Sequence, residues 1–353
     1  MLYFLRMASM SLYRKYRPAS FEEVIGQGQV VRVLEAAAIS GKVSHAYLFT
    51  GSRGTGKTSV ARIFSKLIGI TPSDLYEIDA ASNRGIDEVR ELREAVRTLP
   101  FESKYKVYII DEAHMLTTPA FNALLKTLEE PPEHVIFILA TTEAHKLPET
   151  IISRCQTHQF MKPSLKEIEE NLTRVMKGEK YTADKGALGL IAVLAEGSFR
   201  DALTTLEKIL AISKDKKIDI AEVEIVTGAP KSEIIEKFLK AVLENNKDVA
   251  LKILSQANAD NLDMKVFTKL VLRAARLAML LALAHDLEKE IKDDVSEHDF
   301  AFFKKLGIGE NAKRLPNIMR AFLSAYNDIG YSYIPSLPLE LAVIDITSKE
   351  MNI

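Results

Sequence analysis

The feature that most constrains the fold is a glycine-rich segment, GSRGTGKT, at positions 51–58. It has the spacing G-x-x-x-x-G-K-[ST], it directly follows the β-rich run Ala46–Thr50, and a helical pattern begins at Lys57. Glycines let the backbone wrap around a phosphate, while N–H groups and the helix N-terminus point toward the negative charge. The segment therefore predicts a strand, a phosphate-binding loop and a helix, in that order.

The loop residues are predicted to contact the phosphates of a nucleotide. Lys57 is expected to reach the β and γ phosphates, and the hydroxyl of Thr58 is expected to hold Mg²⁺. The residues predicted to bind the nucleotide here are Gly51, Ser52, Arg53, Gly54, Thr55, Gly56, Lys57, Thr58 and Ser59.

Two adjacent carboxylates, Asp111 and Glu112, follow the apolar run VYII at 107–110. The carboxyl ends of parallel strands are where open α/β sheets bind their ligands. Asp111 is therefore predicted to share the Mg²⁺ with Thr58, and Glu112 to act as the general base that polarises the attacking water. The acidic Glu112 favours ATP hydrolysis over nucleotide binding alone.

The order of the expected elements predicts an α/β domain followed by helices. Residues 46–160 alternate β-rich and helical patterns, which is typical of a parallel sheet with crossover helices. Beyond Pro163 the helical pattern dominates, with joints at 162–163 and 228–230, so the expected domains are 1–162, 163–228 and 229–353, the last with about five helices. The expected strands are Ala46–Thr50, Leu75–Asp79, Lys106–Asp111, Val135–Ala140 and Thr157–Phe160, and the expected helices include Lys57–Ile68, Gly85–Leu99 and Pro119–Glu129.

Composition excludes several other classes of protein. The net charge of 47 − 48 = −1 excludes a uniformly basic DNA-coating protein, so any contact with nucleic acid must come from a local patch. The single cysteine, Cys155, excludes an internal disulfide and a multi-cysteine zinc site. The apolar run Leu277–Ala284 is far shorter than the roughly 18 residues of a membrane span, and the apolar stretch before Arg6 is too short for a secretory signal. We therefore expect a soluble, cytoplasmic protein.

Several longer motifs carry a family resemblance. The segments GSRGTGKT, IIDEAH, ILATTEAHKLPETIISRC and GSFRDAL together resemble an AAA+ ATPase. LYRKYRPASFEEVIGQ, HAYLFTGSRGTGKTS, EIDAASN and FNALLKTLEEPPEHVIFILATT are similar, more narrowly, to the gamma/tau subunits of the bacterial DNA polymerase III clamp loader. The resemblance is dense over residues 11–230 and general over 231–353. It implies an AAA+ α/β domain with a five-stranded parallel sheet, a small helical lid and an all-α collar through which subunits assemble.

The resemblance also implies roles for individual residues. Thr142 corresponds to sensor 1, with the neighbouring Thr141 as the alternative, Arg154 to the arginine finger offered to ATP in the adjacent subunit, and Arg200 to sensor 2 in the lid. The stretch Tyr13–Pro18 with Val24–Gln27 resembles the adenine-binding edge, with Arg14, Pro18, Val24 and Ile25 as its implied contacts. Considered without the family, Arg154 and Arg200 are equally well interpreted as exposed surface cations.

One feature departs from the family pattern. Family members commonly carry a four-cysteine zinc module between the phosphate-loop helix and the next strand, whereas here the interval Ile68–Asp74 contains no cysteine. A structural zinc site needs about four Cys or His ligands. We therefore expect ATP and Mg²⁺ as cofactors and no zinc.

A basic helical face is a candidate for DNA contact. Arg90, Arg93 and Arg97 fall on one face of the expected helix, with Arg84 just before it. Such a face suits a duplex backbone and reads no sequence. Ion pairs of Arg90 and Arg97 with Glu94 are the alternative explanation.

The resemblance implies an ATP-driven motor subunit that helps load a sliding clamp onto primed DNA. The implied partners are other copies of the chain, delta-type and delta-prime-type subunits, the clamp and primer-template DNA. Any DNA polymerase activity would belong to the holoenzyme and not to this chain. Two alternatives stay open: another AAA+ motor, such as a branch-migration helicase subunit, which should carry a winged-helix domain, and a scaffold that binds ATP without hydrolysing it.

Overall fold

The computed structural model describes residues 10–82, 92, 94–295 and 297–348. Contacts divide the chain into two compact units. Unit 1 comprises Met1–Glu179 and Ala195–Glu207, and unit 2 comprises Lys180–Leu194 and Lys208–Ile353. The division into 1–162, 163–228 and 229–353 remains a prediction.

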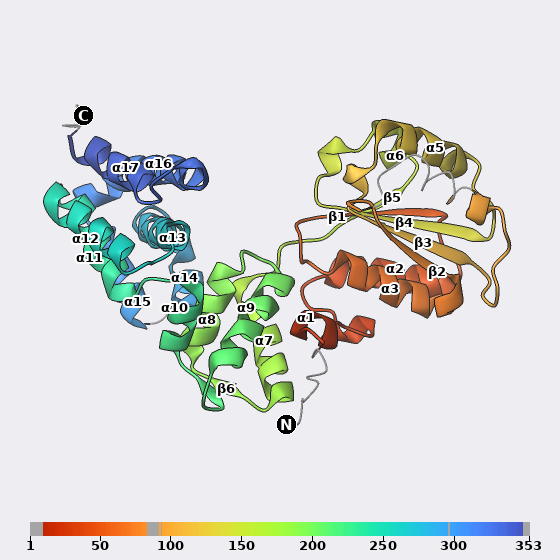
Figure 1. Ribbon diagram of the computed structural model, residues 1–353, viewed down its shortest axis with the longest axis horizontal. Helices are drawn as coiled ribbons and strands as arrows, with labels where there is room; N and C mark the ends of the chain where they lie inside the picture. The colour runs from red at the N-terminus through yellow and green to blue at the C-terminus, as the bar shows by residue number, and fades with distance from the viewer. Residues whose placement is uncertain (1–9, 83–91, 93, 296, 349–353) are drawn as a thin grey trace, which may run out of the picture. The chain divides into compact units, whose positions relative to one another are not determined.

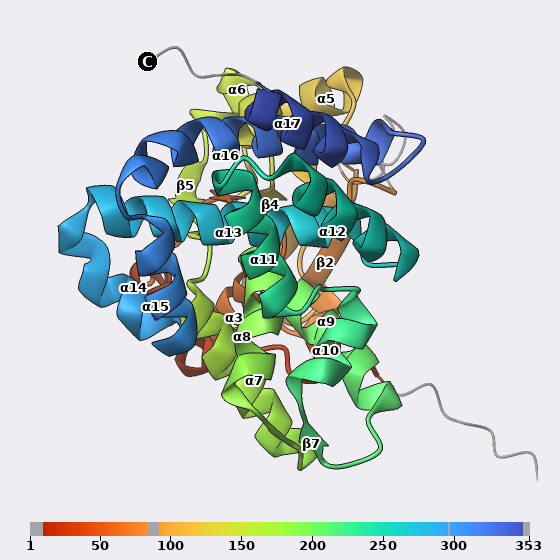
Figure 2. The same ribbon diagram turned by 90° about the vertical axis from the view of Figure 1, so that its left-hand side faces the viewer.

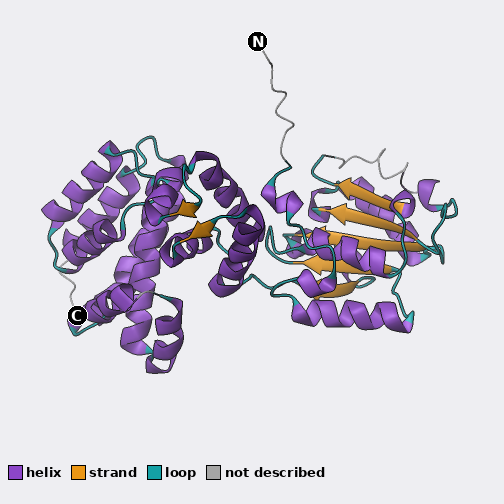
Figure 3. Ribbon diagram, turned by 90° about the horizontal axis from the view of Figure 1, so that it is seen from below, coloured by secondary structure: helices purple, strands orange, loops and turns teal. Residues whose placement is uncertain are grey.

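Unit 1 contains the predicted five-stranded parallel sheet, with strand order β2-β3-β4-β1-β5 (Figure 3). The register places Thr50 opposite Thr141 and Asp79 opposite Asp111, so the carboxyl ends of neighbouring strands meet at one edge. The strands are β1 (Ala46–Thr50), β2 (Leu75–Asp79), β3 (Lys106–Asp111), β4 (Val135–Thr141) and β5 (Gln156–Gln159).

Helices cover both faces of this sheet (Figure 1). On one face lie α2 (Gly28–Ser40) and α3 (Lys57–Leu67), and on the other lie α5 (Thr118–Glu129) and α6 (Glu149–Ile152). Unit 1 also contains α1 (Leu12–Lys15), α7 (Leu165–Glu179) and the first part of α9 (Phe199–Ile212).

The three central strands, β1, β3 and β4, are buried on both faces because their side chains alternate between two apolar clusters. Tyr47 and Phe49 of β1 pack with Phe64 of α3 in one cluster. Leu48 of the same strand packs with Phe121 of α5 in the other. A strand buried on both sides reads as a continuous apolar run, which is why the sequence predicted these strands well.

Unit 2 is almost entirely helical. Its core is built around Phe238, Phe267 and Phe322, which are fully buried. Its elements are β6 (Thr182–Ala183), α8 (Lys185–Leu194), β7 (Lys217–Ile218), α10 (Ile220–Thr227), α11 (Ser232–Leu243), α12 (Lys247–Ala259), α13 (Met264–Leu283), α14 (Glu288–Asp294), α15 (Glu297–Leu306), α16 (Glu310–Asp328) and α17 (Leu337–Ser348).

The longest helix of unit 2 is α13, and it packs against α15 and α16 (Figure 2). The apolar run Leu277–Ala284 lies at the end of this helix, where Ala278 and Leu281 are buried in the core. Across the described residues, no helix combines the length and the apolar character that a membrane crossing requires.

Several expected boundaries differ from the structure. β5 begins and ends one residue earlier than the expected Thr157–Phe160, and α5 begins at Thr118 because Thr117 caps it by accepting from the backbone N–H of Ala120. The two-residue strands β6 and β7 pair with each other and were not predicted, since two residues give no periodicity. The described part of 229–353 holds seven α-helices and not about five, because α14 and α15 are short and separate. The helix expected over Gly85–Leu99 falls largely outside the described residues.

Candidate nucleotide-binding site

The phosphate loop connects β1 to α3, and two of its glycines are required by close approach. A Cβ on Gly51 would lie 2.5 Å from the carbonyl oxygen of Phe160, and one on Gly54 would lie 2.1 Å from Oγ of Ser198. Both glycines also adopt positive φ, 144° and 74°, which side chains disfavour. The loop is thus fixed by the segment after β5 and by the start of α9.

Lys57 is held against the backbone of its own loop. Its side chain is buried, and Nζ donates to the carbonyl oxygens of Gly51, at 2.8 Å, and Ser52, at 2.9 Å. Burial lowers the pKa of Lys57, while the nearby carboxylates of Glu112 and Asp111 work to raise it. The ammonium group is therefore already positioned beside the loop that is expected to take the phosphates.

The two residues predicted to share Mg²⁺ are in direct contact. Oγ1 of Thr58, in the first turn of α3, donates to Oδ2 of Asp111, at the end of β3, over 2.7 Å. A hydroxyl and a carboxylate are the hard oxygen ligands that Mg²⁺ prefers, usually one or two from the protein. The donor set fits the ion.

Glu112 occupies a strained backbone conformation. Its φ of 47° and ψ of 45° are left-handed, a region that costs a residue with a Cβ roughly 1–2 kcal/mol. Its N–H donates to Oδ1 of Asp111 at 3.0 Å, and its carbonyl oxygen accepts from the N–H of Met115 at 2.8 Å. Strain held in this way clusters at functional sites.

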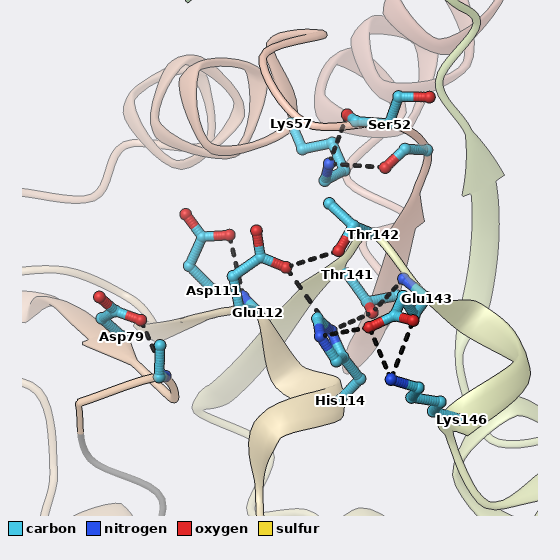
Figure 4. Close-up of polar contacts among 12 residues, drawn as sticks. Ser52, Lys57, Asp79, Asp111, Glu112, His114, Thr141, Thr142, Glu143 and Lys146 are labelled. Atoms are coloured by element: carbon cyan, nitrogen blue, oxygen red, sulfur yellow. Dashed lines mark hydrogen bonds and ion pairs between the residues drawn. The ribbon is translucent and has the colours of Figure 1, made fainter. Parts of the chain in front are cut away.

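The carboxylate of Glu112 contacts Thr142, the residue predicted to be sensor 1, as Figure 4 shows. Oγ1 of Thr142 donates to Oε2 of Glu112 at 3.0 Å. The predicted general base and the predicted sensor therefore lie side by side, brought together by the adjacent ends of β3 and β4.

A histidine that the sequence analysis did not single out joins this group. Nδ1 of His114 lies 3.0 Å from Oγ1 of Thr141 and 3.5 Å from Oε2 of Glu112, and its Nε2 lies 3.0 Å from Oε2 of Glu143. Lys146 hydrogen-bonds Glu143, and this bond is the main cause that lowers the pKa of Glu143. The histidine side chain is only 7% exposed. His114 thus connects Glu112 to the ion pair of Glu143 with Lys146 (Figure 4).

A cavity beside the loop collects most of the predicted nucleotide-binding residues. Its walls include loop residues 53–59, Asp111 and Glu112, together with Pro18, Val24, Ile25 and Arg200. Gly51, Ser52, Arg14, Thr142 and Arg154 are not among its lining residues. The guanidinium of Arg14 lies over the ring of Tyr13, at 5.7 Å from its centroid, and the cavity is lined instead by Tyr16 and Arg17.

Two further walls of the cavity were missed by the sequence analysis. Asn171 and Arg174 line it from α7, and Phe199 and Leu203 line it from α9 beside Arg200. The guanidinium of Arg200 lies 5.6 Å from the centroid of the Tyr13 ring. These residues are distant in sequence from the phosphate loop, so no local motif could have indicated them.

Arg154 is engaged away from the cavity of its own chain. Its Nη2 forms an ion pair with Oε1 of Glu129 at 2.9 Å, and its Nη1 donates to the carbonyl oxygen of Thr150 at 2.8 Å. The neighbouring thiol of Cys155 has its pKa raised to about 11 by burial, so it stays protonated and unreactive at neutral pH. Arg154 is therefore held by Glu129 and Thr150 of its own chain.

The predicted DNA-contacting residues are only partly covered by the structure. Arg97 is exposed, whereas Arg84, Arg90 and Arg93 lie outside the described residues. One group that could hold a metal ion, Glu236, His298 and Asp299, occurs in the described part of unit 2. It contains no cysteine and does not correspond to the family's zinc module.

Comparison with known proteins finds replication subunits. The sequence model of the "DNA polymerase III clamp loader subunit, ATPase lid domain" matches residues 167–215, and that of the "DNA polymerase III, delta subunit" matches residues 70–164. DNA polymerase III subunit tau of Bacillus subtilis is 38% identical over 364 aligned positions, which cover 96% of this chain and 63% of the relative. Over most of its length the chain is similar to DNA polymerase III gamma/tau subunits.

Other gamma/tau subunits are similar to this chain at comparable identity. The gamma/tau subunit of Mycoplasma genitalium is 40% identical, covering 73% of this chain and 47% of the relative, and subunit tau of Escherichia coli is 37% identical, covering 79% and 45%. The chain therefore spans about half to two thirds of the length of these relatives. The model of magnesium chelatase subunit ChlI also matches residues 20–115.

Solved structures support the fold. The RuvB Holliday junction branch migration motor of Thermotoga maritima aligns with a TM-score of 0.52 at 24% identity, covering 65% of this chain and 80% of that chain. At this level of identity the likeness concerns the fold alone, which is that of an AAA+ P-loop domain.

Proposed function

We propose that this chain is an ATP-driven motor subunit of a clamp loader, which helps to open a sliding clamp and close it on primer-template DNA. The observation that carries the proposal is the convergence of Lys57, Thr58, Asp111 and Glu112 on one cavity, in a chain similar to gamma/tau subunits. The short distances among these groups fit ATP hydrolysis better than nucleotide binding alone, because Glu112 adds a base to a complete phosphate site.

The roles of the residues follow from their positions. Lys57 exchanges its two backbone carbonyls for phosphate oxygens, and Thr58 with Asp111 holds Mg²⁺, which neutralises charge on the phosphates. Glu112 accepts the proton of the attacking water, and Thr142 orients Glu112 or senses the γ-phosphate. Arg200 approaches the nucleotide from α9.

Arg154 is proposed to act on the nucleotide of a neighbouring subunit. It does not line the cavity of its own chain, and its partner Glu129 is exposed, so the ion pair costs little to break. An arginine supplied in trans stabilises the charge that develops on the transferred phosphoryl group and accelerates hydrolysis by roughly 10³–10⁵-fold. Hydrolysis would then depend on assembly.

The assembly surface is proposed to be the helical region 229–353, acting as a collar. Large apolar side chains are exposed on its last helices and the segment between them, including Leu323, Tyr331, Tyr333 and Leu341. Contiguous exposed apolar surface marks sites of association. The proposed partners are other copies of this chain, delta-type and delta-prime-type subunits, the clamp and DNA, with Arg97 among the candidate phosphate contacts. We also propose a cytoplasmic location.

A branch-migration motor is the runner-up, and it is not favoured. Such a motor should carry a winged-helix domain with a β-ribbon, whereas the described residues of 229–353 form helices only. The likeness to RuvB is confined to the shared fold.

Mixing two inactive variants tests the function and the role of Arg154 together. Arg154→Ala should bind ATP almost normally and lose most partner-stimulated hydrolysis, by about 10³-fold. Lys57→Ala should lose hydrolysis at its own site. Clamp-stimulated and primed-DNA-stimulated ATPase activity should reappear when the two are mixed, because some junctions then combine an intact Lys57 with an intact Arg154. Mixed oligomers that stay inactive would place Arg154 outside catalysis in trans, and a wild-type chain without stimulated ATPase would refute the motor function.

A further inference from the structure

One buried amide in the cavity lacks a partner within the chain. Asn171 on α7 lines the cavity and is 8% exposed, and its Oδ1 is buried without a hydrogen-bond partner. Buried polar side-chain atoms in folded proteins are nearly always hydrogen-bonded, so an unpaired amide oxygen on a residue that lines a cavity indicates a ligand that completes it.

The helix that carries Asn171 is fixed in place by several contacts. One turn after Asn171, Nη1 of Arg174 donates to the carbonyl oxygen of Glu23 at 3.3 Å, and the two side chains share one helical face. At the end of α7, Glu179 accepts from Oη of Tyr16 at 2.6 Å and pairs with Lys15 at 2.7 Å. Burial raises the pKa of Tyr16 to about 12, so this phenol remains a donor.

Close packing holds α7 against the N-terminal segment of the chain. A Cβ on Gly178 would lie 2.3 Å from Oη of Tyr16, and one on Gly26 would lie 3.0 Å from Oε1 of Glu167. α7 therefore sits against the segments around Tyr16 and Gly26, and Asn171 is presented to the cavity from a rigid wall.

The wall around Asn171 suits a flat, mostly apolar ring. Pro18, Val24 and Ile25 line the cavity from the N-terminal segment, and Leu203 lines it from α9. The phosphate loop forms another part of the lining, and its residues Lys57 and Thr58 are the predicted contacts of the phosphates. A nucleotide with its phosphates on the loop has its base left for the apolar walls.

We propose that Asn171 recognises the 6-amino edge of adenine and thereby selects ATP over 6-oxopurine nucleotides. An amide offers one acceptor and one donor side by side, which match the N6 amino group and the ring nitrogen N7. Guanine and hypoxanthine carry an oxygen at position 6 beside N7, so this edge presents two acceptors and the amide oxygen has no donor to accept from. The inference rests on the proposed ATP-binding function and adds the residue that sets its base specificity.

The size of the effect follows from one bidentate contact. A well-made pair of this kind discriminates against the wrong base by on the order of 10- to 100-fold. Replacing Asn171 by leucine keeps the shape of the side chain and removes both hydrogen-bonding atoms. Asn171→Leu should therefore weaken ATP binding by that factor, leave inosine triphosphate binding almost unchanged and bring the ratio of the two affinities close to one.

The experiment compares three chains in equilibrium binding. Wild type, Asn171→Leu and the control Glu170→Gln, an exposed neighbour on the same helix, are titrated with ATP, inosine triphosphate and inorganic tripolyphosphate. The tripolyphosphate probe reports the phosphate loop alone, so it should bind all three chains equally and thereby confirm that the variant is folded.

The outcomes separate this inference from the proposed function. Loss of the ATP preference in Asn171→Leu, with normal tripolyphosphate binding and a normal Glu170→Gln control, supports the role of Asn171. An unchanged preference in Asn171→Leu, or a wild type that binds ATP and inosine triphosphate equally, overturns it and leaves ATP binding intact. A wild type that binds neither nucleotide overturns the proposed function itself.

Discussion

Replacing Asp74 by asparagine should measurably destabilise unit 1. Asp74 is fully buried, and its carboxylate accepts three backbone N–H groups from the loop before β3. Oδ1 accepts from Phe101 at 2.7 Å, and Oδ2 accepts from Glu102 at 2.9 Å and Ser103 at 2.7 Å. Asp74 lies at the end of the short interval where gamma/tau relatives commonly have the zinc module, so one carboxylate organises this part of the surface.

The pKa of Asp74 sets the size of the effect. Burial works to raise this pKa, but the amides of Glu102, Phe101 and Ser103 outweigh it and lower the pKa from 3.8 to about 2. At 1.36 kcal/mol for each pH unit, a lowering of this size corresponds to about 2 kcal/mol. Because the loop faces water, solvent screening reduces this contribution. We therefore expect Asp74→Asn to lower the free energy of unfolding by about 1–2 kcal/mol.

The sign of the pH dependence is fixed by the lowered pKa. The folded state favours the charged carboxylate, so its stabilisation is complete above the unfolded pKa of about 3.9 and is lost as the pH falls toward 2. Asp74→Asn removes the charge at every pH. The difference between wild type and variant should therefore be constant near neutral pH and should shrink below about pH 4.

Urea unfolding of the full chain, followed by circular dichroism at several pH values, measures this difference. The control is Glu133→Gln, which removes one exposed carboxylate of the same unit. Hydrogen exchange at residues 101–103 reports the same contact locally and should accelerate in Asp74→Asn alone. Equal unfolding free energies at pH 7, or a difference that persists unchanged down to pH 3, would refute the reasoning.

Three further predictions concern the site and the metal content. Glu112→Gln should retain ATP affinity and lose turnover by about 10²-fold or more, the usual contribution of a general base. Near-normal turnover in a steady-state assay would contradict the assignment of Glu112 as the general base. His114→Ala should lower kcat with little change in ATP affinity, since His114 contacts Glu112 but does not line the cavity. Glu143→Gln should lower kcat less, because the amide oxygen of glutamine still accepts from Nε2 of His114. Metal analysis after dialysis should find no stoichiometric zinc, and one zinc per chain would contradict the expectation from the single cysteine.

The elements that the sequence predicted are those whose signal is local. The phosphate loop, the strand before it and the carboxylates Asp111 and Glu112 each lie within one short segment, so spacing alone indicated them. Three of the five expected strands, β1, β2 and β3, match the structure at both ends, and in β1 and β3 a continuous apolar run marks the strand. The described residues of 229–353 hold seven helices in place of about five, because the periodicity of the short helices is too brief to separate them.

What the sequence could not predict depends on contacts between distant segments. Asn171 reaches the cavity only because α7 packs against the N-terminal segment, and its helical pattern gives no sign of that. His114 and Glu143 meet because β3 and β4 are neighbours in the sheet. Arg14 was implied by resemblance as part of the adenine edge, but on the four-residue helix α1 it turns toward Tyr13, and Arg17 lines the cavity.

The groups assigned to hydrolysis are each bound to another part of the chain, and these contacts differ in strength. The pair of Arg154 with Glu129 is exposed and contributes about 0–1 kcal/mol, so a neighbouring phosphate displaces it easily. Lys57 is buried, but phosphate oxygens replace its two carbonyls with stronger, charge-assisted bonds, so nucleotide binding itself drives that exchange. Glu112 is held by Thr142 through a hydrogen bond to a charged group, and such a bond contributes about 1.5–3 kcal/mol. In the proposed mechanism the γ-phosphate takes the hydroxyl of Thr142, which leaves Oε2 of Glu112 available to the attacking water. We therefore propose that this exchange at the Thr142–Glu112 contact is a step at which partners can control hydrolysis.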